Sequence, residues 1–398
     1  MQCRICKSNN LTSVIDLGSQ PWCNHFLSRD EVGKEPFYPL RVQYCNECST
    51  AQLDYTVKKE IMFGNHTYLS GVTKSLSKHF ENIAIEVNER FVFNSINKSI
   101  LDIGSNDGTQ LKHFQALGWE VLGVESSVQT SEMAINSGIP TLNDFYNLDT
   151  AKQLKRKFDV VNAAGVFFHL EELHSVTSGI KLNLNTDGVF VVQFLYMKSI
   201  MENNAFDQIY HEHLLYYTLQ TLSLLLEKHE LEIFDAYLAP IHGGQMIAFV
   251  GHPGEHMKTK RLENLLKEEM ESNCNSIDAY QDFAVRIEKM RLENIKFLQS
   301  AKLEGKRVFG MGAPVKGNTL LNYFNVGTDL IECLLEKNEL RRGLFSPGMH
   351  IPIFIENEVE DIPDIYYVLA WNFKNEILAN NAHLLEKGVQ FYFPVNIL

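Results

Sequence analysis

The residues with the clearest chemical potential form one short run, Tyr210-His211-Glu212-His213. A histidine with an ordinary pKa of about 6.5 can remove a proton near neutral pH. A neighbouring glutamate can orient that histidine, and a tyrosine can donate a hydrogen bond to an oxygen that gains negative charge. If the run is extended, His211 and His213 point to one side, and Tyr210 and Glu212 point to the other. The run therefore predicts a site of proton transfer.

Two other interpretations of this run stay open. His211 and His213 have the His-x-His spacing of a metal site, which would suit metal-dependent hydrolysis, although no third ligand stands nearby in the sequence. The run is equally compatible with a polar loop that packs under Tyr216 and Tyr217. Activity that a chelator abolished without unfolding the chain would favour the metal interpretation.

A glycine-bearing turn after an expected strand at 100–104 predicts a site for a small ligand. Glycines allow a tight turn and a close approach of a ligand to the backbone. Glu125 closes the next expected strand, 17 residues after Gly108, where an acid can accept the hydroxyl groups of a ribose. The turn lacks the three glycines of the dinucleotide fingerprint and resembles that of the S-adenosylmethionine methyltransferases. The predicted cofactor-binding residues are Asp102, Gly104, Asn106, Gly108, Glu125 and Ser126. The alternatives are a purely structural turn and a solvated acid at a strand end.

Four of the seven cysteines form two Cys-x-x-Cys pairs, Cys3/Cys6 and Cys45/Cys48. In a reducing compartment, such pairs indicate metal knuckles more than a disulfide framework. Two knuckles supply the four ligands of a closed, tetrahedral zinc site, which has no open position and is therefore structural. The alternative is two unrelated buried pairs. The remaining cysteines stand alone and are expected to be small core residues: Cys23, Cys274 and Cys333.

The expected secondary structure divides the chain into three domains. Residues 1–72 are turn-rich, with short strand-like runs, and form the metal domain. Residues 73–250 alternate helical patterns with expected strands, which indicates a parallel, doubly wound sheet. Residues 251–398 begin with a charged helical stretch and continue as a second αβ unit. The expected strands after the metal domain are 100–104, 119–125, 158–164, 188–194, 306–310, 330–335 and 365–371, and the charged helical stretch is 256–303.

Composition and charge exclude several classes of partner. The net charge of −13 argues against a nucleic-acid or anionic-membrane partner, because binding phosphates usually needs a basic face. No apolar run approaches the roughly 20 residues that span a bilayer. The first residues lack the basic-then-apolar pattern of a signal segment. We therefore expect a cytoplasmic protein without a membrane partner, either a monomer or a weak homo-oligomer.

Motifs along the whole chain resemble the nucleotide-sugar C-methyltransferases, which methylate C3 of 4-keto-deoxysugars. In the first domain, the resemblance rests on the cysteine pairs and on 16–21 (Asp-Leu-Gly-Ser-Gln-Pro). In the second domain, it rests on 103–108, 123–125, 209–213, Tyr216 and 242–244. In the third domain, it rests on 310–313, 316–322, 347–353 and 370–373. The resemblance implies an α/β protein with a small zinc-binding N-terminal domain, a Rossmann-like S-adenosylmethionine methyltransferase domain and a Rossmann-like C-terminal αβ domain.

The resemblance also implies a role for each matching residue. His213 would be the base that removes the proton alpha to the ketone, with Glu212 as its partner and Tyr210 bonded to the sugar. Tyr68 and His169 would face the substrate. The nucleotide-sugar would be bound by Lys316, Asn318, Thr319 and His242. S-adenosyl-L-methionine would occupy the glycine turn, and Zn²⁺ the cysteines.

Departures from the family pattern leave the substrate open. Ala164-Gly165 replaces a usual pair of asparagines, and Gln193 replaces a usual glutamate. The first site adjoins the cofactor and the second adjoins the sugar, so the pocket can differ. One alternative is a methyltransferase of the same fold that acts on another acidic carbon or a hydroxyl of a different small molecule. Another is a binding protein that keeps the fold without turnover.

Overall fold

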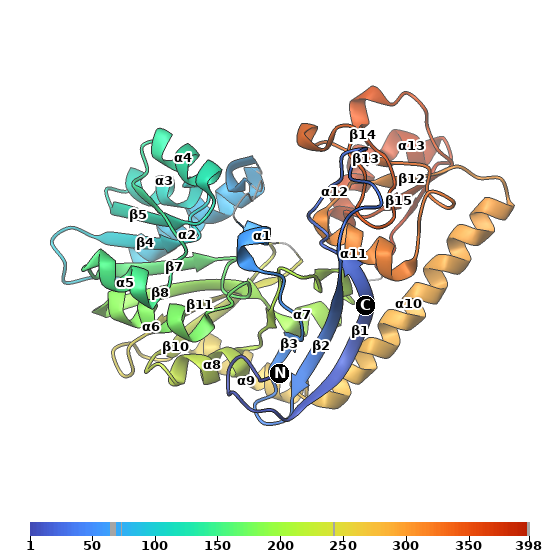
Figure 1. The fold of residues 1–398 in the computed structure, drawn as a ribbon. Helices are drawn as coiled ribbons and strands as arrows, with labels where there is room; N and C mark the ends of the chain where they lie inside the picture. The colour runs from blue at the N-terminus through green and yellow to red at the C-terminus, as the bar shows by residue number, and fades with distance from the viewer. Residues whose placement is uncertain (64–68, 73, 242, 396–398) are drawn as a thin grey trace.

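The computed structural model describes residues 1–63, 69–72, 74–241 and 243–395, which form three β-sheets (Figure 1). The N-terminal sheet is antiparallel and has the order β1-β2-β3-β9. Its strands are β1 (Leu11–Pro21), β2 (Phe37–Cys45), β3 (Ala51–Leu53) and β9 (Leu215–Tyr216). Because β9 comes from the middle of the chain, this sheet joins the first domain to the second.

The middle sheet has seven strands in the order β10-β11-β8-β7-β4-β5-β6. Its strands are β4 (Ser99–Ile103), β5 (Glu120–Glu125), β6 (Thr141–Asn143), β7 (Phe158–Ala164), β8 (Leu184–Leu195), β10 (Glu232–Ala239) and β11 (Gln245–Gly251). Strands β4 to β8 are parallel, and β10 and β11 are antiparallel. The strand order reverses at β4: β5 and β6 lie on one side of it, and β7 and β8 lie on the other. Ligands of such sheets bind outside the carboxyl ends of the strands at this switch point.

Helices cover both faces of the middle sheet, and the side chains of β4 alternate between two cores. Ile100 packs with residues of α2 (Lys74–Arg90) and α3 (Thr109–Ala116), whereas Leu101 packs in the core that includes α6 (Leu173–Asn183). This two-sided burial explains why β4 reads as a continuous apolar run. The other helices around this sheet are α4 (Val128–Asn136), α5 (Leu148–Leu154), α7 (Met197–Glu202), α8 (Leu219–Glu227) and α9 (Lys260–Glu271).

The C-terminal sheet is wholly parallel, with the order β14-β13-β12-β15-β16. Its strands are β12 (Val308–Met311), β13 (Leu334–Glu336), β14 (Ile353–Ile355), β15 (Ile365–Val368) and β16 (Gln390–Tyr392). Its helices are α11 (Val315–Phe324), α12 (Lys374–Asn380) and α13 (Ala382–Glu386). The predicted α/β class, with a small cysteine-bearing N-terminal domain, is confirmed, but the middle sheet expected to be parallel also has two antiparallel strands, β10 and β11.

A single long helix, α10 (Ile277–Leu303), connects the middle domain to the C-terminal domain (Figure 1). At about 1.5 Å per residue, its 27 residues span about 40 Å. Despite this length, none of the helices in the described part of the chain combines the length and apolar character of a membrane span. The helix therefore serves as a strut between two domains.

The structure differs from the sequence-based expectations in several places. β1 is a strand of 11 residues, but two register shifts break its alternation, so the sequence showed only short strand-like runs. The helical stretch 256–303 is two helices, because Asn273 turns the chain at φ 54° and Ser276 caps α10. The strand expected at 330–335 is confined to β13. A boundary after residue 250 would also separate α9 from β10, although Arg261 Nε donates to Asp235 Oδ1 at 3.0 Å.

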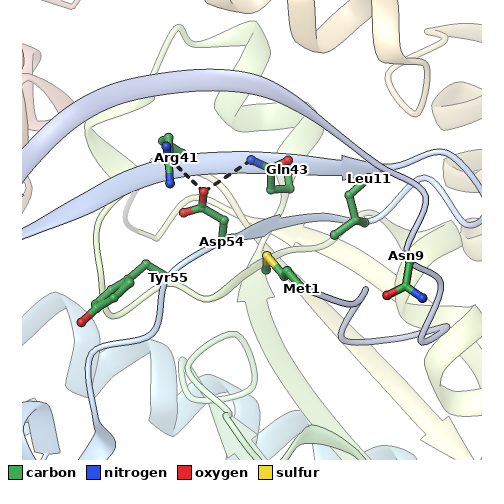
Figure 2. A pocket seen from close by; sticks show the side chains of 7 residues that line it. All are labelled: Met1, Asn9, Leu11, Arg41, Gln43, Asp54 and Tyr55. Atoms are coloured by element: carbon green, nitrogen blue, oxygen red, sulfur yellow. Dashed lines mark hydrogen bonds and ion pairs between the residues drawn. The ribbon is translucent and has the colours of Figure 1, made fainter.

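The N-terminal sheet carries a surface hollow of about 330 Å³ (Figure 2). In it, Arg41 Nε pairs with Asp54 Oδ2 at 2.8 Å, and Gln43 also points at this carboxylate. The hollow is lined by Met1, Asn9, Leu11, Arg41, Gln43, Asp54 and Tyr55. None of these is a predicted site residue, so the candidate site lies elsewhere.

Candidate active site

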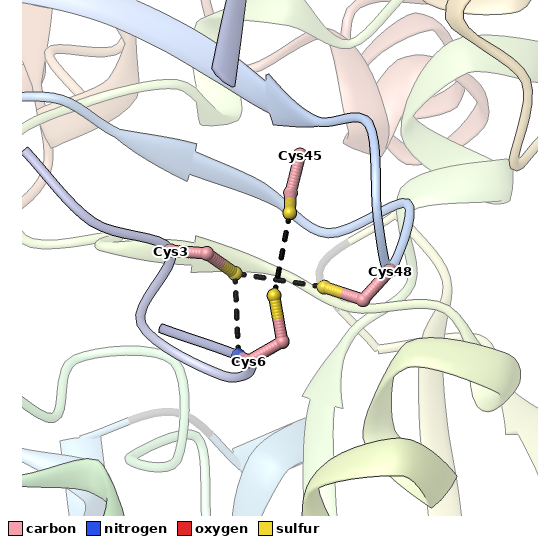
Figure 3. Close-up of side chains that lie close together, drawn as sticks. All are labelled: Cys3, Cys6, Cys45 and Cys48. Carbon is pink, nitrogen blue, oxygen red and sulfur yellow. Dashed lines mark hydrogen bonds between the residues drawn. The ribbon is translucent and has the colours of Figure 1, made fainter. Parts of the chain in front are cut away.

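The four paired cysteines converge in the N-terminal domain (Figure 3). Their Sγ atoms lie within 4.8 Å of one another, and the Cys3–Cys48 and Cys6–Cys45 Sγ distances are both 3.5 Å. Four sulfurs about 2.3 Å from a tetrahedral zinc ion are about 3.8 Å apart, so the cluster matches such a shell. Because the cysteines fill all four positions, the zinc is structural. The remaining cysteines are buried singly, as predicted.

Both knuckles have the same backbone geometry. Lys7 donates its backbone N–H to Cys3 O at 3.0 Å, and Ser49 donates to Cys45 O at 2.9 Å. Lys7 and Ser49 both have positive φ, 66° and 60°. Each turn therefore curls back on its first cysteine and brings its two thiols to one point. The second knuckle begins at the last residue of β2, so the metal site fixes the end of this strand.

The predicted cofactor turn lies at the carboxyl end of β4 and follows a tight path. Gly104, Asn106 and Gly108 all have positive φ, at 69°, 51° and 76°. A Cβ on Gly104 would stand 2.6 Å from Val166 Cγ2, so a larger residue does not fit there. The turn is therefore specified by its glycines, and it is held by backbone bonds from Gly104 N to Val124 O at 2.8 Å and from Gly108 N to Ser105 O at 3.0 Å.

Glu125 stands at the end of β5 and holds the turn in place. Its Oε2 accepts from Asn106 N at 2.9 Å, and its Oε1 accepts from Ser127 N at 2.8 Å. Burial raises the pKa of Glu125. Ser126, half-buried, follows it, and its carbonyl accepts from Asn143 Nδ2 at 3.2 Å. The acid thus occupies the position from which a ribose can be bound.

Asp102 lies below this turn, inside the sheet. It is 3% exposed, and its Oδ1 accepts from Asn162 Nδ2 of β7 at 2.6 Å. Burial raises the pKa of Asp102 to about 7. This bond joins β4 to β7, and the predicted role of Asp102 in cofactor binding stays a prediction.

The run Tyr210–His213 forms a turn and is not extended. His213 donates its backbone N–H to Tyr210 O at 2.9 Å, and the two rings lie 3.7 Å apart between centroids. The expectation that His213 and Tyr210 point to opposite sides is therefore wrong, because the turn reverses the chain between them. The rings of these two residues form one surface.

The ring of His213 is oriented by a backbone carbonyl. Its Nδ1 lies 2.6 Å from Gln208 O, and because a carbonyl can only accept, Nδ1 carries the proton. Nε2 is then the basic nitrogen of the neutral ring. His169 stacks on this ring at 5.3 Å, and Phe168 meets it edge-on at 4.7 Å. His169 thus lies beside His213, and its predicted contact with the substrate stays a prediction.

Glu212 turns away toward the N-terminal domain. Its Oε1 accepts from Trp22 Nε1 at 2.8 Å, the side chain of Asn24 also bonds to it, and burial raises its pKa to about 7. Gln208 O, rather than Glu212, is the acceptor that orients His213.

His211 packs on β2, with Nε2 3.3 Å from Tyr38 O, and burial lowers its pKa to about 4. It does not converge with His213 on a common ligand. Within the described ranges, the group of side chains arranged to hold a metal is the cysteine cluster. The His-x-His metal interpretation, and the hydrolysis that it would support, therefore have no structural basis.

The predicted nucleotide-binding residues of α11 lie at a domain interface. Asn318 and Thr319 are fully buried, and Asn318 Nδ2 donates to Cys23 O at 2.7 Å. Lys316 Nζ lies 3.6 Å from Asp207 Oδ2 and 3.8 Å from the centroid of the Trp371 ring. These positions join domains and, for Asn318 and Thr319, offer no open surface to a nucleotide. Tyr68 and His242 lie outside the described residues.

The two departures from the family pattern meet at the carboxyl edge of the sheet. His79 Nε2 lies 2.8 Å from Gln193 Oε1, and Gln193 Nε2 donates to Gln245 Oε1. Burial lowers the pKa of His79, so all three groups are uncharged near neutral pH. Gly165 donates its N–H to Gln193 O at 3.0 Å. A neutral polar network thus lies next to the turn that carries His169.

Sequence reasoning missed the residues that hold the turn at 210–213, which we call the catalytic turn after its predicted role. Trp22 binds Glu212, Asp207 binds Trp371, and Gln208 acts through its carbonyl. The tryptophans carried a signal, since a buried indole N–H usually finds an acceptor. A backbone carbonyl leaves no trace in the residue types, so Gln208 was not predictable.

Comparison with protein families now bears on this architecture. Three family models follow one another along the chain: a zinc binding domain at 3–63, a methyltransferase domain at 76–236 and a C-methyltransferase C-terminal domain at 240–396. The chain belongs to the C-methyltransferases that depend on S-adenosylmethionine. A curated relative, the C-methyltransferase NovU of Streptomyces niveus, is 29% identical over 400 residues, which cover 99% of this chain and 95% of the relative.

Solved structures of methyltransferases resemble part of the chain. An S-adenosylmethionine-dependent methyltransferase from Clostridium acetobutylicum is 14% identical over 46% of this chain and 94% of its own, with a TM-score of 0.36. Another, from Anabaena variabilis, is 16% identical over 43% of this chain and 84% of its own, also with a TM-score of 0.36. Each covers less than half of the chain, so the fold assignment rests on the strand order of the middle sheet itself.

Proposed function

We propose that this C-methyltransferase methylates a carbon next to the ketone of a nucleotide-linked 4-keto-deoxysugar, with C3 as the expected position. The observation that supports this proposal is the geometry of His213. Its Nδ1 donates to Gln208 O, which leaves Nε2 as a base, and its ring lies against the rings of Tyr210 and His169. A carbon next to a ketone is acidic enough for such a base.

The chain's own residues account for the proton transfer. His213 Nε2 takes the proton from the carbon alpha to the ketone, and the electrons of the C–H bond form an enolate. Tyr210 lies against the His213 ring, where its hydroxyl can donate to a sugar oxygen as negative charge develops there. His169 stacks on the same ring, and Phe168 packs edge-on against it.

S-adenosylmethionine, when bound, supplies a sulfonium methyl that the enolate carbon attacks, which restores the ketone and leaves a thioether. The residues suited to hold it are Gly104, Asn106, Gly108, Glu125 and Ser126, at the carboxyl ends of β4 and β5. Glu125 is pre-oriented by two backbone N–H groups, so it can accept ribose hydroxyls without rearranging. The protein's task is to bring two carbons into contact.

The nucleotide contacts remain predictions with unequal support. Lys316 is next to the segment that carries the catalytic turn, whereas the burial of Asn318 and Thr319 supports a structural role for them. Tyr68 and His242 are kept as expected substrate contacts. The neutral His79–Gln193–Gln245 network favours an uncharged polar substituent on the sugar, since a charged group would be buried there without a counter-ion.

The direct test supplies purified protein with ¹³C-methyl-labelled S-adenosylmethionine and a panel of keto-sugar nucleotides. We expect a new carbon-bound methyl in the product NMR spectrum and a loss of about 10²- to 10⁴-fold in kcat for His213→Asn. The matched control is His383→Asn, on the exposed side of α13, which should keep full activity. Absence of methyl transfer to carbon with every nucleotide would overturn the proposal.

A second measurement separates the alternatives. In D₂O without cofactor, a functioning base exchanges the alpha proton of the keto-sugar for deuterium. Exchange that requires His213 supports the carbon-acid reaction. Methyl transfer to oxygen without exchange indicates a hydroxyl substrate instead. Binding of S-adenosylmethionine by calorimetry with neither exchange nor transfer identifies a non-catalytic binding protein.

A further inference from the structure

Three buried side chains connect the catalytic segment to the C-terminal domain. Asp207, in the short helix η2 (Phe206–Gln208), accepts from Trp371 Nε1 at 2.7 Å through its Oδ2. The same oxygen lies 3.6 Å from Lys316 Nζ of α11. Lys316 Nζ in turn lies 3.8 Å from the centroid of the Trp371 ring. We call this group the Asp207–Lys316–Trp371 cluster.

The cluster is costly, which argues that it does more than stabilise the fold. Asp207 is fully buried, and Lys316 is nearly so. Burial raises the pKa of Asp207, although Lys316 and Trp371 lower it in part, and burial lowers the pKa of Lys316. Asp207 Oδ1 and Lys316 Nζ have no hydrogen-bond partner within the described part of the chain. A buried pair with imperfect geometry is a weak source of stability.

The position of Asp207 shows what the cluster holds. Asp207 immediately precedes Gln208, whose carbonyl receives the Nδ1 proton of His213 at 2.6 Å. The peptide that carries this carbonyl is also held in place, because its N–H group, that of Ile209, donates to Phe206 O at 2.9 Å. Anchoring the Asp207 side chain therefore sets the direction of the carbonyl. That direction decides which ring nitrogen of His213 keeps its proton.

We propose that Asp207, Lys316 and Trp371 are positioning residues that hold the Gln208 carbonyl and, through it, the tautomer and orientation of His213. The inference rests on the proposed role of His213 as the base. It assigns to Lys316 a task other than nucleotide contact. It also makes the catalytic orientation of the base depend on the docked C-terminal domain, since Lys316 and Trp371 both come from it.

The test uses the full chain and three single variants. Asp207→Asn keeps an acceptor for Trp371 but removes the charge, Lys316→Met removes the charge at similar length, and Trp371→Phe removes the indole N–H together with part of the ring. Lys374→Met, at the exposed first residue of α12, is the matched control. Thermal unfolding verifies that each variant is folded. Trp371→Phe, which leaves both charged side chains in place, carries the test if either charge variant does not fold.

The first readout is the ring ¹⁵N spectrum of the histidines, with the His213 signals assigned by their loss in His213→Asn. In the wild type, we expect neutral His213 with its proton on Nδ1. In the three cluster variants, we expect a mixture that includes the Nε2–H tautomer, while Lys374→Met resembles the wild type. An unchanged tautomer in all folded cluster variants would overturn the proposal.

The second readout is kinetic. We expect kcat to fall by about 10- to 100-fold in each cluster variant, with KM and cofactor affinity within about twofold, because a small misplacement of the base costs this much. The kcat of the Asp207→Asn/Lys316→Met double variant should be no lower than the kcat of the less active single variant, because the two residues act through one contact. A change confined to KM in Lys316→Met would instead make Lys316 a substrate contact and overturn its positioning role. The tautomer of His213 can be measured without turnover. An altered tautomer in the cluster variants, together with an inactive wild type, would therefore refute the proposed reaction but support the positioning role of the cluster.

Discussion

At the scale of single residues, the sequence placed four ionisable groups side by side, and the fold separates them into distinct environments. His213 faces Gln208 O, Glu212 faces Trp22, and His211 faces Tyr38 O. Burial raises the pKa of Glu212 to about 7 and lowers that of His211 to about 4, so burial favours the neutral form of each. In the proposed reaction, His213 is the member of this run that takes up a proton.

The raised pKa of Glu212 makes stability depend on pH. The native state binds this proton up to about pH 7, whereas the unfolded state releases it near 4.5, so stability falls as pH rises between these values. The full loss is about 3 kcal/mol, at 1.36 kcal/mol per pKa unit. Glu212→Gln keeps an acceptor for Trp22 and removes the titration.

Denaturant unfolding of the zinc-loaded protein at pH 5, 6, 7 and 8 measures this effect. We expect the free energy of unfolding of Glu212→Gln, relative to the wild type, to rise by about 2–3 kcal/mol from pH 5 to pH 8. Glu60→Gln, on an exposed surface, is the control and should show a constant difference. A constant difference for Glu212→Gln as well would mean that Glu212 is ionised in the native state throughout.

At the scale of elements, the metal site and the catalytic turn are linked through one sheet. β2 ends at Cys45, β3 pairs with β2, and Gln52 of β3 pairs with Leu215 of β9, two residues after His213. Removing zinc should therefore loosen β3 and β9, because the knuckle fixes the end of β2. Structural zinc contributes several kcal/mol to folding.

Hydrogen exchange of Cys48→Ser, or of the wild type with a chelator, tests this link. We expect faster exchange at the amides of 51–53 and 214–216, together with a lower free energy of unfolding. Cys274→Ser, which alters a buried cysteine outside the cluster, should leave exchange in these segments unchanged. If exchange accelerated only at residues 1–10 and 45–50, the zinc site would stabilise its immediate surroundings and have no effect on the catalytic turn.

The cofactor turn gives a second prediction at this scale. Gly104→Ala meets both a positive φ and Val166 at 2.6 Å, whereas Gly138→Ala meets a positive φ of 86° in open space. We expect both to lose about 1–2 kcal/mol of stability from backbone strain, and only Gly104→Ala to weaken S-adenosylmethionine binding by calorimetry, by about tenfold or more. Equal affinities in the two variants would show that the cofactor does not use this turn.

The elements that the sequence predicted best are those buried on both faces. Residues 100–104 and 119–125 are largely apolar runs, and they end in a glycine turn and in an acid, respectively. The sequence therefore predicted both the strands and the edge of the sheet where a ligand would bind. β9 could not be predicted, because a strand of two residues has no periodicity. The contact of Gln208 O with His213 spans 5 positions in the sequence, and that of Trp22 with Glu212 spans 190. Residue types alone do not specify such contacts. The same holds for Asn318, predicted as a ligand contact and found at an interface.

At the scale of the whole molecule, the N-terminal domain lies between the other two and binds each of them (Figure 1). It joins the middle domain through β3 and β9. It joins the C-terminal domain through Leu27, which bridges to Phe345, and through Glu35. Because the catalytic turn also depends on contacts from both flanking domains, the three domains should act as one unit.

The contacts of Glu35 allow a direct test of whether the three domains act as one unit. Its side chain is 1% exposed, and its Oε1 accepts from Gly348 N at 3.0 Å and pairs with His350 Nε2 at 2.6 Å. Burial alone would raise its pKa, but the bonds from His350 and Gly348 outweigh burial and lower it. The carboxylate therefore stabilises the folded protein above its ordinary pKa of 4.5, and this contribution is lost as pH falls below that value.

Glu35→Ala leaves the Gly348 N–H without an acceptor and should cost about 2–3 kcal/mol in the free energy of unfolding at pH 7. Glu35→Gln keeps an acceptor and should cost about 1 kcal/mol.

Hydrogen exchange shows which segments this loss of stability reaches. If the domains act as one unit, Glu35→Ala accelerates exchange at 345–351 and also at 206–213, because a loosened N-terminal domain releases Trp22 from Glu212 and Cys23 from Asn318. Acceleration confined to 345–351 would show instead that the catalytic turn is held by the middle domain and the Asp207–Lys316–Trp371 cluster alone.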